Sequence, residues 1–230
     1  MANVVIADVG KLDFQTTRKV VDLVESEEQI TDDRLSVIDY ENVHKVPLDS
    51  HSVYMPSTLM DGSHVKDGNV YFDLELYPFF QKAREVISKN TKGVFRLRRI
   101  VGDEDNSIIA SDLYVLSTVF GEPEHVYVKR SREDIATQHV IVTVNFGGGT
   151  MAHLDYTFSG QEYIELEWSG MQRIIEFNSN EMNPFGSKLH TALPLSYSVD
   201  AILKLSYQVD DELVEKLEQF QQVVDGGVHS

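Results

Sequence analysis

The chain has 230 residues, long enough for one large domain, and its 37 acidic against 20 basic residues give a formal net charge of −17. This charge repels phosphate backbones and anionic lipid surfaces, so we expect neither nucleic acid nor a membrane as a partner. The sequence has no cysteine, which excludes disulfides, thiolate nucleophiles and sulfur-ligated metal sites. No segment approaches the ~20 apolar residues of a membrane helix and no basic region precedes the first apolar run, so we expect a cytoplasmic protein.

The first 69 residues carry a weak α/β pattern. Two β-branched runs, Asn3–Ala7 and Arg34–Ile38, predict strands. Between them Asp13 stands where an N-cap starts a helix, and apolar residues at helical spacing predict that helix over 14–27. Residues 39–69 are rich in His, Ser, Asp, Gly and Pro, and we expect an irregular loop there.

The next fifty residues alternate between strand and helix patterns. They predict a strand at 70–76, a helix at 78–87, a strand at 94–101 and a helix at 107–120. In the strand at 94–101, alternation directs Arg96 and Arg98 out of the core. One face of the sheet is therefore expected to be open.

Strands then follow one another without room for helices. Five candidates lie at 124–130, 139–146, 150–158, 162–168 and 173–177. The turns between them are short, which requires antiparallel pairing. Gly147–Gly149 predicts a hairpin turn with positive φ rather than a phosphate loop, because a strand and not a helix follows. A helix over 196–205 and a final amphipathic helix capped by Asp210 complete the pattern.

These elements predict an α+β fold. Its main part is a large open, mostly antiparallel β-sheet with helices packed on one face, and a small α/β remnant precedes it. We expect a remnant with an irregular loop at 1–69, the main domain at 70–225 and a free tail at 226–230.

Two polar groups are candidate ligand sites. Arg96 and Arg98 share one strand face, as do His153 and Asp155, so a polar cluster on the open face is one interpretation. A solvated or subunit-covered face explains the same pattern and is favoured.

A metal site is the weaker prediction. The irregular segment holds His44, His51 and His64 with Asp49 and Asp61, side chains that suit zinc or manganese. Their spacing fits no compact ligand pattern, so the sequence favours surface histidines and no metal.

Several strings together resemble a known family. YPFFQKAREVI followed by GVFRLRRI, then LSTVFGEPEHVYV, NFGGGTMAHLDYTF and IELEWSGMQRIIEF are similar in order and spacing to the C-terminal domain of the glucose-fructose oxidoreductase, inositol dehydrogenase and MocA (Gfo/Idh/MocA) oxidoreductases. The resemblance covers Val70–Phe177 and implies the fold of that domain. It also implies that the dinucleotide-binding domain is absent or truncated, because no Gly-x-Gly-x-x-Gly turn occurs anywhere in the chain.

The resemblance also implies that the family's catalytic groups are lost. The segment VVIADVGKLDFQTTRKVVDLV resembles the surroundings of the family's Glu-Lys-Pro motif, but Ala7-Asp8-Val9 occupies the motif and Lys11 is out of register. The family's proton-transfer Asp and His correspond to Ser107 and Ser111, with Asp112 within reach only if the alignment shifts by one residue. We therefore expect no cofactor.

With catalysis not expected, the resemblance points to a function of the open sheet face, which in the family commonly forms the subunit interface. The resemblance implies a homodimer, or a complex with a full-length relative, acting as an assembly, regulatory or ligand-binding module. The large apolar residues expected to supply such a contact, or in part the core, are Trp168, Tyr163, Tyr156, Phe158 and Met151.

Two alternatives stay open. One is an oxidoreductase-like subunit acting on a sugar or polyol, either with cofactor supplied by a partner subunit or without cofactor, using Asp112, Ser111, Arg96 and Arg98. The other is a sensor that retains a sugar-like ligand without turning it over. The sequence leaves enzymatic activity uncertain and favours its absence.

Overall fold

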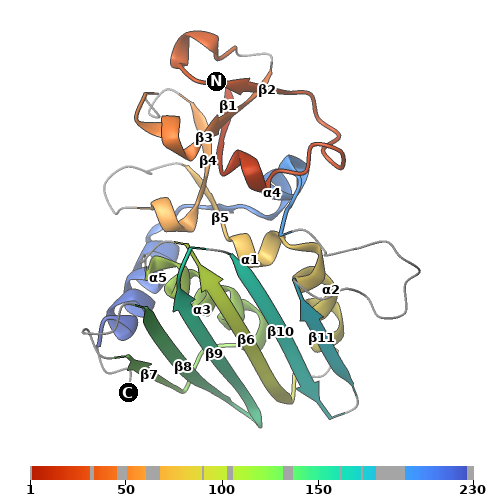
Figure 1. Cartoon of the computed structure of the whole chain (residues 1–230), viewed down its shortest axis with the longest axis vertical. Helices are drawn as coiled ribbons and strands as arrows, with labels where there is room; N and C mark the ends of the chain where they lie inside the picture. The colour runs from red at the N-terminus through yellow and green to blue at the C-terminus, as the bar shows by residue number, and fades with distance from the viewer. Residues whose placement is uncertain are drawn as a thin grey trace. The chain divides into compact units, whose positions relative to one another are not determined.

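The computed structural model describes residues 2–31, 34–45, 51–60, 68–89, 91–102, 106–131, 137–160, 162–171, 173–179 and 195–226. The chain divides into two compact units. The first comprises Met1–Pro78 and Leu195–Lys216, and the second Phe79–Pro194 and Leu217–Ser230. Each unit contains one six-stranded sheet (Figure 1). The first unit is therefore assembled from two distant parts of the chain.

The first sheet has the strand order β12-β5-β4-β1-β3-β2. Its strands are β1 (Asn3–Ala7), β2 (Val21–Val24), β3 (Leu35–Asp39), β4 (Ser52–Pro56), β5 (Asn69–Tyr71) and β12 (Tyr207–Gln208). Strands β1 to β5 pair in parallel, and β12 pairs antiparallel with β5. The strands predicted at 3–7 and 34–38 are confirmed as β1 and β3.

The helix predicted over 14–27 is wrong, because this segment contains β2 and a 3-10 turn, η2 (Glu27–Gln29). The Asp13 carboxylate accepts from the backbone N–H groups of Gln15 (2.9 Å) and Thr16 (3.3 Å), and the Thr17 hydroxyl donates to the Asp13 carbonyl. Such side-chain bonds compete with a helix. The β-branched residues that follow then favour a strand.

The irregular loop expected over 39–69 is also wrong in part. The structure places a 3-10 helix, η3 (Tyr40–Lys45), strand β4 and a 3-10 turn, η5 (Ser57–Leu59), in this region. The strand predicted over 70–76 ends early, since β5 stops at Tyr71 and the short helix α1 (Asp73–Leu76) follows. Strands of three to five residues are too short to show a clear alternation by which to recognise them.

The second sheet has the order β11-β10-β6-β9-β8-β7. Its strands are β6 (Gly93–Val101), β7 (His125–Arg130), β8 (Gln138–Gly147), β9 (Thr150–Phe158), β10 (Tyr163–Gly170) and β11 (Ile174–Asn178). Strand β6 lies between β9 and β10, parallel to the former and antiparallel to the latter. The expectation that all five later strands pair consecutively is therefore wrong between β9 and β10, although the other pairings are antiparallel as predicted.

Helices cover one face of the second sheet (Figure 1). They are α2 (Pro78–Ile87), α3 (Ser107–Phe120) and the end of α5 (Asp211–Val224), while α4 (Val199–Leu205) belongs to the first unit. The ring of Phe95 on β6 contacts Phe80 of α2 and Phe120 of α3, and Phe120 stacks on Trp168 at 5.5 Å between ring centroids. The α+β fold with one open sheet face is confirmed.

The core takes most of the aromatic residues expected on that open face. Trp168, Tyr156 and Phe158 are buried beneath the helices, so an interface role for them is wrong. Met151 lies on the open face and is 44% exposed, and Tyr163 is half-buried. Strand alternation fixes this division, since alternate residues of β9 and β10 point to opposite faces.

The glycine turn between β8 and β9 is a hairpin, as predicted. Gly147, Gly148 and Gly149 have φ angles of 73°, 60° and 90°, values that side chains with a Cβ rarely adopt. Within the part of the chain that the structure describes, no helix is both long and apolar enough to cross a bilayer.

Candidate functional site

The carboxyl ends of the parallel strands are where open α/β sheets commonly bind their ligands. Strand β1 ends at Ala7, and a 3-10 turn, η1 (Val9–Lys11), follows. The Val9 N–H donates to Asp39 Oδ2 at 3.2 Å, and the Gly10 N–H donates to Asp8 Oδ1 at 2.8 Å. Two carboxylates of the chain therefore occupy the N–H groups that open this turn.

The remaining backbone N–H groups of the turn also donate to acceptors of the chain itself. The N–H of Lys11 donates to the Asp8 carbonyl, that of Leu12 to the Val9 carbonyl, and that of Asp13 to the Tyr197 carbonyl, at 3.0, 3.2 and 2.9 Å. A phosphate-binding turn needs N–H groups that point at the ligand. Every N–H from Val9 to Asp13 is instead used internally.

A cluster of tyrosines is linked to this turn through an ion pair between Lys11 and Asp73. Asp73 accepts from Lys11 Nζ at 3.2 Å and from the Tyr197 hydroxyl at 3.0 Å, and the Tyr71 hydroxyl donates to the Ile6 carbonyl at 2.8 Å. Burial raises the pKa of both Tyr71 and Tyr197, and nearby charges including Asp73 raise these pKa values further. Both tyrosines are therefore neutral hydrogen-bond donors at physiological pH.

Sequence reasoning missed this cluster. It placed Lys11 out of register with a catalytic motif, and did not single out Asp73 or Tyr197. Lys11 and Asp73 are 62 residues apart, and Asp73 and Tyr197 are 124 apart. No local sequence pattern could have shown that these three residues are in contact. That required a correct assignment of β5 and the knowledge that the segment around Tyr197 belongs to the first unit.

The catalytic candidate Asp112 lies in the core of the second unit. Its two oxygens accept from Arg99 Nη1 at 2.9 and 3.0 Å, and the Tyr156 hydroxyl donates to Oδ2 at 3.0 Å. Arg99 and Asp112 are each 1% exposed. Burial, and then the charge of Asp112, raises the pKa of Tyr156. This carboxylate is used in a buried ion pair, and a substrate could contact it only after that pair broke.

The two serines predicted at the proton-transfer positions lie on α3. The Ser111 hydroxyl donates to the Ser107 carbonyl one turn earlier at 2.9 Å, and Ser111 is 4% exposed. Ser107 is half-buried at the first residue of the helix. The Ser111 hydroxyl is therefore hydrogen-bonded within its own helix, and is not arranged as a nucleophile that donates to a general base.

The four ligand candidates on the open face lie together. Arg96, Arg98, His153 and Asp155 line one shallow pocket of about 160 Å³ with Leu97, Glu165 and Glu167. Arg96 Nη1 lies 2.6 Å from Glu167 Oε1, and Arg98 lies 3.5 and 3.6 Å from the carboxylates of Asp155 and Glu165.

These pairs are direct cross-strand neighbours. Arg96 stands opposite Glu167, and Arg98 stands between Glu165 and Asp155 in the register of β10, β6 and β9. The arrangement is a ladder of surface ion pairs, which we call the charge ladder (Arg96, Arg98, Asp155, Glu165 and Glu167). Its carboxylates neutralise the arginines and reduce their attraction for an anionic ligand.

Of the metal candidates, the structure describes His44 and His51. His44 is exposed, and both ring nitrogens of His51 are shielded from solvent without a hydrogen-bond partner among the described residues. His64, Asp49 and Asp61 lie outside the described residues. Among the residues that the structure does describe, no three His, Asp or Glu side chains are grouped to hold a metal ion.

Comparison with known proteins supports the fold and leaves the chemistry open. No protein-family model matches the sequence, and no curated protein matches it significantly. Among solved structures, a dehydrogenase from Chromobacterium violaceum superposes with a TM-score of 0.54 at 11% identity, over 98% of this chain and 93% of that one. The chain therefore has a dehydrogenase-like fold, which agrees with the fold that the resemblance to the Gfo/Idh/MocA oxidoreductases implied. The resemblance stated from the sequence is thus confirmed for the fold.

Two further structures agree. A putative oxidoreductase from Magnetospirillum magnetotacticum MS-1 gives a TM-score of 0.51 at 10% identity, over 98% of this chain and 92% of that one. A probable dehydrogenase from Thermotoga maritima gives 0.50 at 12% identity, over 78% and 76%. Coverage of 98% includes the first sheet, so the dehydrogenase-like fold is not confined to the second unit. Identities this low carry the fold alone.

Proposed function

We propose that this chain is a dehydrogenase-fold protein that binds no dinucleotide and transfers no hydride, and that it acts as an assembly subunit through the open face of its second sheet. The observation that carries the first part is the turn after β1. Its first N–H groups are bound by Asp39 and Asp8, which also place negative charge where a pyrophosphate would have to lie. Like charges in direct contact are strongly unfavourable.

The state of the catalytic candidates supports the same proposal. Asp112 is held by Arg99 and Tyr156 in the core, and Ser111 donates within its own helix. A general base must reach the proton that it abstracts, directly or through one water. Neither side chain is placed to do so.

The open face supports the second part of the proposal. Exposed apolar side chains lie on both sides of the charge ladder: Tyr127 on β7, Ile141 on β8, Met151 on β9 and Ile174 on β11. Large apolar side chains exposed on one face of a sheet are a feature of protein interaction surfaces, although charged residues are usually depleted at the centre of such surfaces. Since the ladder is already paired within the subunit, a second copy of this chain need not supply charges to it.

Calorimetry tests the loss of the nucleotide site. Titration of NAD⁺, NADH, NADP⁺ and NADPH into the protein should give no binding heat at micromolar concentrations. The variant Asp112→Asn is a useful control, since it alters the core and leaves the turn after β1 unchanged. Micromolar affinity of the unmodified chain for any of the four nucleotides would overturn the proposal.

Light scattering tests the assembly role. We expect a homodimer at micromolar concentration, and expect Met151→Glu to convert it to monomers. Phe14→Glu is the matched control, because Phe14 is 41% exposed against 44% for Met151 and lies in the first unit. A strictly monomeric unmodified protein, or equal loss of dimer in both variants, would contradict assembly through this face.

One observation favours a second function, an oxidoreductase-like subunit acting on a sugar or polyol with cofactor supplied by a partner subunit. Lys11 and Tyr197, two side chains able to move protons, meet at Asp73 beside the strand ends. Mixing the chain with a full-length relative and following nicotinamide reduction with polyols would test it. Activity above that of the relative alone, lost in Tyr197→Phe, would support this alternative.

A further inference from the structure

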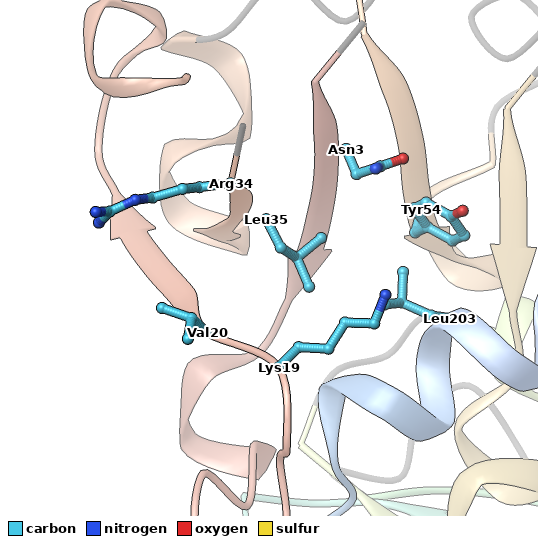
Figure 2. Close-up of a pocket in the computed structure, with 7 residues that line it drawn as sticks. All are labelled: Asn3, Lys19, Val20, Arg34, Leu35, Tyr54 and Leu203. Atoms are coloured by element: carbon cyan, nitrogen blue, oxygen red, sulfur yellow. The ribbon is translucent and has the colours of Figure 1, made fainter. Parts of the chain in front are cut away.

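A second hollow lies in the first unit, near the amino ends of the parallel strands (Figure 2). It has a volume of about 720 Å³ and is lined by Asn3, Lys19, Val20, Arg34, Leu35, Tyr54 and Leu203. Asn3 and Leu35 begin β1 and β3, and Leu203 lies on α4. This amino-end pocket is therefore separate from the closed turn, which lies at the opposite ends of the same strands.

The pocket exists because a helix is missing. Parallel sheets normally carry helices on both faces. Here residues 14–20, which precede β2, form a turn and irregular backbone instead of a helix, and the register places Asn3 beside Leu35, and Val5 beside Tyr54, on one face of the sheet. Val20, immediately before β2, is 75% exposed at the pocket. The face between α4 and β2 is consequently left hollow.

Three polar side chains in the pocket have no assigned role in the fold. Lys19, Asn3 and Tyr54 make no side-chain hydrogen bond or ion pair with the rest of the described chain. Figure 2 shows the Lys19 side chain extending toward Leu203 and the Asn3 amide directed toward Tyr54. Arg34 extends away from the other lining residues and binds Asp22 at 3.2 and 3.3 Å.

Among the described residues, Lys19 lacks the ion pair that several other cations in this acidic chain form. Side chains held in ion pairs include Lys11, Arg34, Arg96, Arg98, Arg99 and Arg130. With a net charge of −17, carboxylates are abundant, yet none of those described pairs with Lys19. An uncommitted ammonium group in a hollow is a ready partner for an anion from solution.

We propose that the amino-end pocket binds a small organic anion that carries an apolar group. Lys19 pairs with its carboxylate or phosphate, and the Asn3 amide and Tyr54 hydroxyl donate to the same oxygens. Leu35 and Leu203 contact the apolar part. The volume falls within the roughly 300–1,000 Å³ of small-molecule sites.

Thermal shift and calorimetry with four probes test the ligand class. Benzoate and phenyl phosphate distinguish a carboxylate from a phosphate, benzyl alcohol lacks the charge, and inorganic phosphate lacks the apolar group. We expect a rise in melting temperature with at least one aromatic anion, since a ligand that binds only the folded state stabilises it. Added salt should weaken this binding. Equal response to benzyl alcohol, or response to none of the probes, would overturn the proposal.

Variants test the location. Lys19→Met keeps the length of the side chain and should weaken binding of the anion at least tenfold, and Tyr54→Phe should weaken it several-fold. Lys204→Met is the matched control, since Lys204 is an exposed lysine on α4 that does not line the pocket. If Lys204→Met weakens binding as much as Lys19→Met, the anion follows total charge and the site is wrong. Lys19 is exposed, so its replacement should not impair folding.

The two proposals fail separately. Dinucleotide binding would overturn the proposed function and leave the amino-end pocket untouched, provided that Lys19→Met did not alter it. Absence of anion binding would remove the pocket proposal without bearing on the turn after β1 or on assembly.

Discussion

The two six-stranded sheets differ in strand direction and in where their polar side chains lie. The first is almost wholly parallel, and at its carboxyl ends the chain's own carboxylates and tyrosines occupy the polar groups. The second is mostly antiparallel, covered by helices on one face and open with a charge ladder on the other. The two sheets thus place their polar groups differently, because strand pairing and the chemistry of loops and surface side chains are separate properties.

The largest expected effect concerns the buried charge of the second unit. Asp112→Ala removes the closest carboxylate from Arg99, which stays in the core with Glu162 at 3.7 Å, and should cost about 3–5 kcal/mol of unfolding free energy. Urea denaturation measures it. The double variant Arg99→Met/Asp112→Leu removes both charges and should lose less. A single-variant loss under about 1 kcal/mol would show that the pair is not buried.

The next effect tests the close approach of strands in the same sheet. A Cβ at Gly93 would lie 2.5 Å from the Ser169 carbonyl oxygen and 2.9 Å from Trp168 Cη2. Gly93→Ala should therefore cost about 1–3 kcal/mol through overpacking. Gly102→Ala is the control, because nothing lies within 4 Å of its added Cβ. Equal stability of the two variants in chemical denaturation would mean that β6 and β10 are less tightly packed than described.

The third prediction uses alkaline pH to test the buried tyrosines of both units. Burial raises the pKa of Tyr40, Tyr71 and Tyr197 in the first unit, and of Tyr156 in the second. Above about pH 10 the unfolded chain loses these protons while the folded protein keeps them, so stability is complete below that pH and falls above it. Each such tyrosine should contribute about 1.4 kcal/mol per pH unit.

Denaturation at about pH 9 and about pH 11 provides the measurement. Tyr197→Phe should reduce the loss of stability between these two pH values, and Tyr127→Phe should not, because Tyr127 is 65% exposed. If both variants lose stability as the unmodified protein does, Tyr197 does not retain its proton in the folded state.

The smallest effect concerns the charge ladder. Arg96 and Glu167 have side chains that are 48% and 35% exposed, and such surface pairs typically contribute about 0.2–1 kcal/mol. A double-mutant cycle with Arg96→Ala and Glu167→Ala should give a coupling energy in that range, weakened by salt. A coupling well above it at high ionic strength would mean that the open face is covered, and would strengthen the case for a subunit interface.

Sequence periodicity predicted the second unit well. Helix α3 has the bounds expected from its apolar spacing, and β9 those expected from its alternation. Long elements with one solvent-exposed and one buried face are recognised from the periodicity of their apolar residues. The same alternation placed Arg96 and Arg98 outside, but could not show that Arg99 would meet Asp112 in the core.

The first unit resisted prediction for a physical reason. Its strands have at most five residues, too few to show a clear alternation, and the contacts of its candidate site join distant segments. Apolar spacing at 14–27 fitted a helix, yet Asp13 and Thr17 form local side-chain bonds and β2 pairs with β3. Tertiary pairing overrode a local preference.

The central position of β6 dictates an order of assembly for the second sheet. This strand is synthesised before β7, but its two neighbours are β9 and β10, so its first pairing must wait until the chain has reached Phe158 and its second until Gly170. The local meander β7–β8–β9 can form first, and β6 then adds to it across a long intervening segment. Until that step β6 has two unpaired edges, which makes the nascent chain most prone to aggregation at the strand that later forms the middle of the sheet.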